Sequence, residues 1–108
     1  MNKPASANGI SSLVDIDRLV HEPARLAIIS LLYVVDSADF IFLMNQTGLS
    51  WGNLSAHLSK LEEAGYIQVE KTYRGKRPNT TLRLTPKGRQ AFTLYARKMK
   101  AMFKDFKE

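Results

Sequence analysis

Hydrophobic residues recur along this chain at two spacings, one typical of helices and one typical of strands. From Ile10 to Val20 the apolar positions recur at helical spacing, which predicts a first amphipathic helix. The stretch His21-Glu22-Pro23 interrupts this pattern, and proline is tolerated in the first turn of a helix because its missing N–H would have no partner there. A second helix follows with apolar residues on more than one side, so we expect it at the centre of the core.

The middle of the chain predicts two more helices joined by a tight turn. Asp36-Ser37 is a suitable cap for a short third helix. We expect that helix to end at Thr47-Gly48, since glycine readily takes the left-handed conformation that follows a helix. Ser50 is a good N-cap for a fourth helix over about residues 50–64.

After the fourth helix the sequence changes to a strand pattern. Residues 66–73 alternate and are rich in aromatic and β-branched side chains, residues 74–79 have turn chemistry, and residues 80–84 return as a second strand. Thr85-Pro86 then provides the N-cap and the first-turn proline of a last helix, expected over about residues 86–106. The predicted fold is mainly α with a small β-hairpin, an α+β domain in the order helix, helix, helix, helix, hairpin, helix.

The chain has the length of one small domain. Residues 1–9 contain Pro, Gly, Ser and Asn in place of periodic apolar positions, which predicts a flexible N-terminal arm. Residues 10–108 form the single predicted domain. A chain of 108 residues buries only a small core, so a partner subunit is one way to cover its remaining apolar surface.

Charge is distributed unevenly along the chain. The net charge is +6, but residues 1–65 carry four Lys or Arg against seven Asp or Glu, whereas residues 66–108 carry twelve against three. Such an excess is typical of a protein that binds a polyanion. An ordinary basic surface would give the same numbers, so charge alone leaves both interpretations open.

Composition argues against several other classes of protein. There is no cysteine, and therefore no disulfide framework, thiolate metal site or cysteine nucleophile. No uncharged apolar run approaches the ~20 residues needed to span a bilayer, and the N-terminus lacks the apolar segment of a secretory signal. We therefore expect a cytoplasmic protein without a membrane partner. No Gly-rich phosphate loop or nucleophile context appears, so we expect neither an enzyme nor a cofactor.

The fourth helix has a free face suited to close contact with DNA. Leu54, Leu58 and Leu61 lie at i, i+4 and i+7 and predict one narrow buried stripe. The opposite face is small or polar and has no acidic residue; it consists of Gly52, Asn53, Ala56, Ser59 and Lys60, with Ser55 at its edge. Asn53 can pair with adenine edges, and serine hydroxyls donate to bases or phosphates. A short helix, a turn and this helix predict a helix-turn-helix with the fourth helix in the major groove; the alternative is a solvated helix face.

Ser50, Trp51 and His57 complete the residues of this helix that we expect to bind DNA, and two of them are ambiguous. His57 lies beside the buried stripe, so it is either a packed, half-exposed histidine or a phosphate contact. Trp51 either packs against Leu49 and the preceding helix or lies against the sugar-phosphate backbone. The sequence does not decide between these alternatives.

The tip of the predicted hairpin is strongly basic. Arg74, Lys76 and Arg77 place three positive charges in four residues around Gly75, just before Pro78. A charged turn is usually only a solvated turn. Beside a helix that reads DNA, however, residues 74–78 are better explained as contacts to phosphates or to the minor groove.

The last helix carries a seam of large apolar residues at spacings of three and four: Phe92, Tyr95, Met99, Met102 and Phe106. A helix of ~21 residues would reach ~30 Å at 1.5 Å per residue. It either packs on its own domain or pairs with the same helix and the first helix, including Leu13, of a second subunit. We favour this homodimer, because a two-fold dimer also supplies two helices for two half-sites.

Three separated motifs resemble those of winged-helix regulators of the MarR type (multiple antibiotic resistance) and the ArsR type (arsenic resistance). They are His21–Ile29, Leu54–Ile67 and the stretch from Gly75 to Arg89. The resemblance covers roughly residues 11–105. It implies a winged helix-turn-helix fold and a homodimer on palindromic or pseudo-palindromic double-stranded DNA, most often acting as a repressor.

Two departures from these families limit what the resemblance implies. Metal-sensing members use cysteines near the recognition helix or Asp/His pairs on the last helix, and this chain has neither. His21 and His57 alone do not make a site of the usual ligand count, so we expect no metal. A small-molecule effector stays open. Two rival functions also stay open: nonspecific architectural DNA binding and a winged helix that binds protein.

Overall fold

Helices and strands are interleaved along residues 15–104 and 106, the part of the chain that the computed structural model describes. In chain order the elements are α2 (Pro23–Val35), β1 (Ser37–Asp39), α3 (Phe40–Thr47), α4 (Trp51–Glu63), β2 (Ile67–Arg74), β3 (Arg77–Leu84) and α5 (Pro86–Phe103). The strands form one antiparallel sheet in the order β1-β3-β2. The expected α+β class and the hairpin between the fourth and last helices are confirmed.

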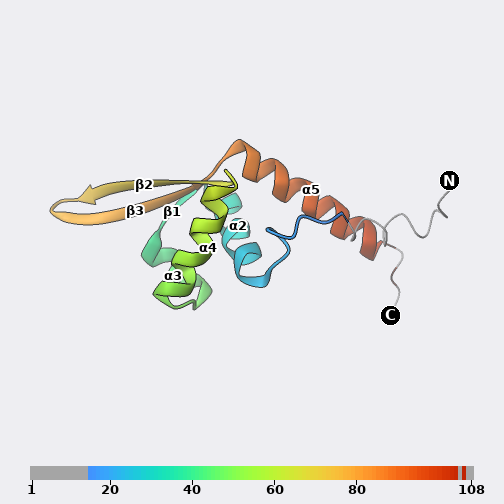
Figure 1. Ribbon diagram of the computed structural model, residues 1–108, viewed down its shortest axis with the longest axis horizontal. Coiled ribbons are helices and arrows are strands. Elements are labelled where there is room, and N and C mark those ends of the chain that lie inside the picture. The colour runs from blue at the N-terminus through green and yellow to red at the C-terminus, as the bar shows by residue number, and fades with distance from the viewer. Residues whose placement is uncertain (1–14, 105, 107–108) are drawn as a thin grey trace.

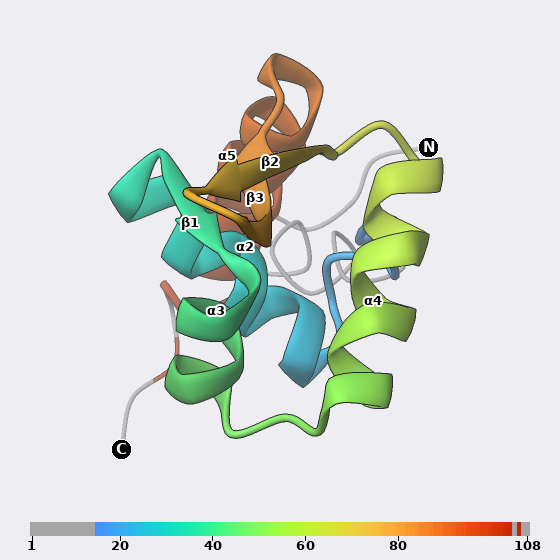
Figure 2. The same ribbon diagram turned by 90° about the vertical axis from the view of Figure 1, so that its left-hand side faces the viewer.

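The core lies between the helices and one face of the sheet. As the apolar pattern of the second helix predicts, α2 is central and packs against α3, α4 and α5. The side chains that are wholly buried come from four elements as well as from the segment before α2; they are Val20, Ile28, Ile29, Leu32, Leu43, Leu54, Leu61 and Leu82. Figure 2 shows α3 and α4 on the same side of the sheet. This arrangement leaves the outer face of α4 free.

The boundaries of α4 and α5 follow the predicted capping residues. α3 ends at Thr47, and Gly48 takes the left-handed conformation with φ 71°. The Ser50 side chain accepts a hydrogen bond from the Asn53 N–H at the start of α4. Thr85 caps α5 in the same way. These side chains satisfy N–H groups that have no partner inside the helix.

The predicted cap of the third helix is wrong. Asp36 ends α2 with φ 67°, and Ser37 opens β1, whose partner residues lie in β3. The cap of α3 is instead Asp39, whose carboxylate accepts a 2.7 Å hydrogen bond from the Phe42 N–H. β1 has only three residues, and its pairing is with a distant part of the chain. A strand this short that pairs only with a distant segment cannot be predicted from the residues around it in the sequence.

The hairpin is longer than predicted. β3 begins at Arg77 rather than at residue 80, and the turn between the strands is Gly75-Lys76, with Gly75 at φ 61°. Pro78 is tolerated in β3 because β1 pairs only with residues 81–83, so next to Pro78 that edge of β3 is free. The result is a narrow two-stranded wing that projects from the sheet.

The two ends of the predicted domain also differ from expectation. Residues 1–14, which include the predicted arm, the first five residues of the predicted first helix and Leu13, lie outside the described residues. Residues 15–20 form turns rather than helix, because the Asp17 carboxylate accepts from the N–H groups two and three residues later. At the other end α5 stops at Phe103 instead of residue 106.

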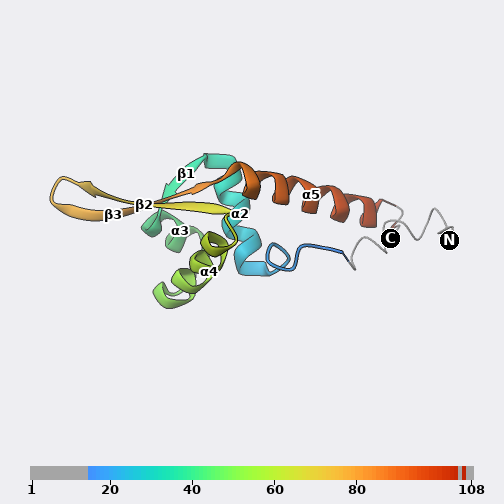
Figure 3. The ribbon, with the colours of Figure 1, turned by 45° about the horizontal axis from the view of Figure 1, so that its top comes forward.

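The hairpin and α5 project in opposite directions from the body of the molecule (Figures 1 and 3). The Cα radius of gyration is 16.5 Å, against roughly 13 Å for a compact domain of about 100 residues. None of the helices in the described residues is both long and apolar enough to cross a membrane.

Candidate nucleic-acid interface

One face of α4 is held in the core and the opposite face is exposed, as its pattern predicts. Leu54, Leu58 and Leu61 are buried. The residues expected on the free face are all exposed, with Ser55 half-buried at the edge; they are Gly52, Asn53, Ala56, Ser59 and Lys60. The turn before α4 is fixed by Thr47, whose hydroxyl donates to the Leu43 carbonyl and accepts from the Leu49 N–H. The buried stripe and the hydrogen-bonded turn therefore orient α4 with this face toward solvent.

Trp51 stands at the start of α4 with most of its ring outside the protein. Its exposed fraction is 62%, and its ring is stacked on Phe40 of α3, with centroids 4.2 Å apart and an interplanar angle of 46°. Packing against the preceding helix, one of the two predicted alternatives, is thus observed. The remaining surface of the indole is still available to a ligand.

His57 points toward α2 instead of outward. Its Nδ1 lies 3.2 Å from Arg25 Nη1 and 3.6 Å from a carboxylate oxygen of Glu22. The ring is half-buried, which matches the packed alternative for this histidine. Among the described residues, no group of three or more His, Cys, Asp or Glu side chains is arranged to hold a metal ion.

Arg25 connects three parts of the structure that position α4, and sequence reasoning missed it. Its guanidinium donates to the carbonyls of Leu19 and Arg18, at 2.6 and 3.5 Å, and faces His57 of α4. Only 11% of its side chain is exposed. The one local sign of this role in the sequence is that Arg25 follows the cap residue Glu22 by three positions. Residues at i and i+3 lie on the same side of a helix, so the two charged side chains can meet.

Glu22 caps α2 and carries a lowered pKa. Burial raises the pKa of its carboxyl group, but hydrogen bonds from the Arg25 and Ala24 N–H groups and the positive charges of His57 and Arg25 outweigh that effect. The carboxylate is 3.1 Å from the Ala24 nitrogen and 2.8 Å from the Arg25 nitrogen. The ionised cap therefore contributes to stability at neutral pH.

The three cations of the hairpin tip differ in their surroundings. Arg74 lies 3.5 Å from the Asp39 carboxylate at the start of α3. Lys76 and Arg77, next to Gly75, are exposed, and neither has a carboxylate within 4 Å among the described residues. Of the three cations at the tip, Lys76 and Arg77 are thus the two that are free to meet a polyanion.

Much of the apolar seam on α5 is covered by its own domain. Tyr95 is only 6% exposed and its hydroxyl lies 2.8 Å from His21 Nδ1. Phe92 stacks on Tyr33 of α2, and Met99 packs against the core. Met102 is half-buried, whereas Phe106 is exposed. Phe92, Tyr95 and Met99 therefore pack on their own domain, which is one of the two alternatives predicted for this helix.

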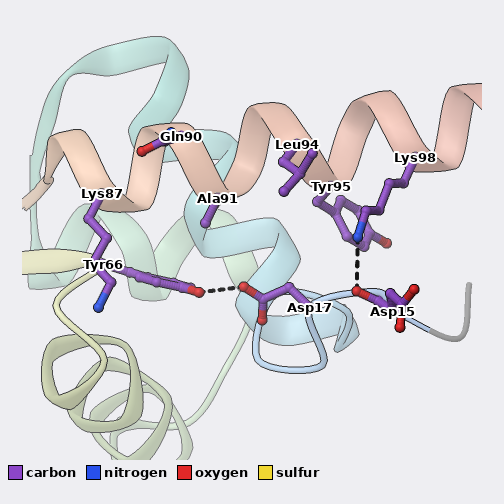
Figure 4. A pocket seen from close by; sticks show the side chains of 9 residues that line it. All are labelled: Asp15, Asp17, Tyr66, Lys87, Gln90, Ala91, Leu94, Tyr95 and Lys98. Atoms are coloured by element: carbon purple, nitrogen blue, oxygen red, sulfur yellow. Dashed lines mark hydrogen bonds between the residues drawn. The ribbon is translucent and has the colours of Figure 1, made fainter. Parts of the chain in front are cut away.

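A cleft of about 260 Å³ lies between the segment before α2 and α5. Figure 4 shows the Tyr66 hydroxyl directed at the Asp17 carboxylate and the Lys98 ammonium directed at the Asp15 carbonyl oxygen. Burial and the neighbouring Asp17 raise the pKa of Tyr66 to about 12. The phenol therefore stays protonated and donates to Asp17 at neutral pH.

Comparison with known proteins assigns the family. A sequence profile of the winged helix DNA-binding domain matches residues 24–103. The chain belongs to this family. An uncharacterised protein of Methanocaldococcus jannaschii is 36% identical to this winged-helix chain over 78 residues, which are 72% of this chain and 85% of the relative.

Solved structures show the same fold. A transcriptional regulator homologue from Pyrococcus horikoshii superposes on this winged-helix chain with a TM-score of 0.84 at 23% identity, covering 93% of this chain and 98% of the other. NadR in complex with 4-hydroxyphenylacetate gives 0.69 at 22% identity, covering 93% and 69%. A MarR-family regulator from Silicibacter pomeroyi gives 0.63 at 20% identity, covering 95% and 69%. The winged helix-turn-helix predicted from the sequence motifs is confirmed.

Proposed function

We propose that this winged-helix protein is a homodimeric transcription regulator that reads double-stranded DNA with α4 in the major groove. The observation that carries the proposal is the acid-free outer face of α4, which is exposed between Gly52 and Lys60 and lies on the same molecule as a projecting basic wing (Figure 1). The major groove is wide enough to admit a helix. In this function α4 is the recognition helix, Asn53 is a candidate for base contacts, and Lys76 and Arg77 contact phosphates or the minor groove.

The dimer is supported by the apolar surface that α5 leaves uncovered. Phe103 and Phe106, near its end, are 53% and 71% exposed, and Leu94 is also exposed. The rings of Phe103 and Phe106 lie 6.5 Å apart, and exposed apolar side chains that lie together on a projecting element are typical of an association site. A two-fold dimer through α5 would present two recognition helices to half-sites roughly 34 Å apart, so the operator is expected to be palindromic or pseudo-palindromic. Most regulators with these motifs repress, and we propose repression here.

DNA reading is tested by selecting duplexes from a random library and measuring their affinity by fluorescence anisotropy. A selected duplex should bind about a thousandfold or more tightly than a scrambled one at the same salt concentration. Asn53→Ala should lose affinity only at particular base pairs, whereas Arg77→Ala should weaken binding to all duplexes and reduce the salt slope by about one. Equal, salt-sensitive binding to both duplexes would favour the architectural function, and no binding would favour a protein partner.

The dimer is tested separately by light scattering. Phe103→Ser with Phe106→Ser should convert dimers into monomers, because both side chains are exposed on one subunit and neither belongs to its core. Tyr73→Ser on the hairpin, which removes an equally exposed aromatic ring, is the matched control and should remain dimeric. A monomeric wild-type protein would refute the homodimer.

A further inference from the structure

A groove of about 300 Å³ runs between α4 and the face of the β2–β3 hairpin. Trp51, Ser55 and Ser59 line it from the α4 side, and Lys71 and Thr80 line it from the strands, over a largely apolar floor. Figure 2 shows α4 and the sheet that form its two walls. Lys71 and Thr80 are not among the residues that the sequence analysis predicts to bind DNA.

We propose that this groove, called here the α4–wing groove, binds a phosphodiester stretch of one DNA strand. The inference rests on the proposed function, with α4 in a major groove and the wing tip in the adjacent minor groove. In B-DNA one sugar-phosphate strand separates these two grooves. A protein that occupies both grooves must therefore let that strand pass between α4 and the wing.

The hydroxyl groups of the groove are free to donate. Elsewhere in the helices Ser30, Thr47 and Thr93 use their hydroxyls on the carbonyl four residues earlier, at 2.7, 2.7 and 2.9 Å. Ser55 and Ser59 make no such bond to any described residue, and the same holds for the Thr80 hydroxyl. Serine and threonine hydroxyls are common donors to DNA phosphates.

The strand wall adds a positive charge beside one of these hydroxyls. Lys71 and Thr80 are directly paired across β2 and β3, so their side chains lie on the same face of the sheet. Lys71 is exposed, and no carboxylate lies within 4 Å of it among residues 15–104 and 106. An ammonium group next to a hydroxyl on one face is suited to a single phosphate.

Trp51 provides the remaining chemistry at the start of α4. Its ring packs against Phe40 and is still 62% exposed, so an apolar surface is available to a deoxyribose. The N-terminal end of a helix also favours an anion. Glu62 lines the groove too, but it belongs to the last turn of α4. Its carboxylate repels phosphate, so the strand is expected at the Trp51 end.

The test replaces single phosphates of a selected duplex by neutral methylphosphonates and measures affinity by anisotropy. Wild-type protein should lose about tenfold at the phosphate between the grooves, and Lys71→Gln should lose a similar factor on all-phosphate DNA, with a salt slope reduced by about one. If Lys71 and that phosphate interact, the two changes together should cost no more than either alone. Lys100→Gln on α5 removes the same charge elsewhere and should keep the wild-type profile.

Two results separate this proposal from the function on which it rests. If wild-type protein selects no duplex, the proposed function fails and the groove proposal fails with it. If wild-type protein reads DNA and Arg77→Ala behaves as expected, but Lys71→Gln keeps the wild-type methylphosphonate profile, only the groove proposal is refuted. The same conclusion follows if Lys71→Gln and Lys100→Gln lose affinity equally.

Discussion

Nδ1 of His57 on α4 lies 3.2 Å from Nη1 of Arg25 on α2. A guanidinium group only donates hydrogen bonds, so Nδ1 of a neutral His57 ring accepts from Arg25, whereas a charged ring has the Glu22 carboxylate 3.6 Å away as its partner. Arg25 also donates to the carbonyls of Leu19 and Arg18. A single side chain of α2 therefore fixes both the segment before α2 and the middle of the helix proposed to read DNA.

Replacing Arg25 is expected to destabilise the domain substantially. Arg25→Ala leaves the Leu19 carbonyl and His57 Nδ1 without a donor, which should cost about 2 kcal/mol of the free energy of unfolding. Urea denaturation measures this change. Arg97→Ala on the exposed side of α5 is the control and should stay within about 0.5 kcal/mol of wild type. Equal stabilities of the two variants would contradict a central role for Arg25.

The Glu22 cap makes stability depend on acid. Because the pKa of this carboxyl is lowered in the folded state, its contribution is complete above the unfolded value of about 4.3 and is lost as the pH falls through the folded value. Glu22→Gln should therefore lose about 1 kcal/mol at pH 7, and its difference from wild type should shrink as the pH falls below the unfolded value. Thermal unfolding at pH 7 and at about pH 3 checks this, with the exposed Glu70→Gln as control. A gap of unchanged size at the lower pH would point to packing instead of charge.

Tyr66 is expected to ionise later than an ordinary tyrosine. Its pKa is raised to about 12 by burial and by its hydrogen bond to Asp17, so in an absorbance titration this phenol should ionise about two pH units late; burial also raises the pKa of Tyr95. Tyr66→Phe should lack this late step and lose about 1 kcal/mol of stability. Because the folded pKa is the higher one, that stability is present below pH 10 and disappears as the pH rises toward 12. Tyr95→Phe is therefore the control; a step near pH 12 that is lost in Tyr95→Phe and kept in Tyr66→Phe would contradict the assignment.

Gly88 has no room for a side chain. A Cβ at this position would lie 2.1 Å from the Tyr66 carbonyl oxygen, an atom that also accepts from the Thr85 N–H. Gly88→Ala should therefore cost at least about 2 kcal/mol, because backbone must move. Chemical denaturation measures it, and a stability equal to wild type would show that α5 shifts freely.

Gly52 provides the opposite case in a helix of the same protein. A Cβ there meets nothing within 4 Å, so Gly52→Ala should raise stability by up to about 1 kcal/mol. If α4 approaches the floor of the major groove as proposed, the added methyl group should nevertheless weaken DNA binding. We expect Gly52→Ala to be more stable than wild type but to bind DNA more weakly. An affinity equal to that of wild type would place Gly52 away from the DNA.

The parts of the fold that were predictable from sequence are those decided by neighbours in the chain. Ser50 and Thr85 cap helices because a hydroxyl at that position reaches an N–H three residues later. The Leu54, Leu58 and Leu61 stripe follows from helix periodicity alone. In contrast, Ser37–Asp39 become a strand only because Thr81–Arg83 arrive beside them, and Pro78 stays in a strand only because that edge is open.

The candidate site was predictable to the same degree. The free face of α4 follows from the position of its buried stripe, but the surroundings of His57 depend on Arg25, which is 32 residues away. Tyr95 and Phe92 fit an apolar seam equally well whether the partner is a second subunit or the same domain. Their actual partners, His21 and Tyr33, are known only once the chain is folded.

The contact between Gly88 and the Tyr66 carbonyl lies where the hairpin and α5 diverge. From Gly88 to Phe103 α5 extends about 22 Å, so a tilt of 5° about this point displaces its far end by about 2 Å. In a dimer joined through that far end, the same tilt in each subunit would change the separation of the two recognition helices. If the protein forms the proposed dimer, the close approach of Gly88 to the Tyr66 carbonyl oxygen would restrict this tilt and with it the range of half-site spacings that the two α4 helices can reach.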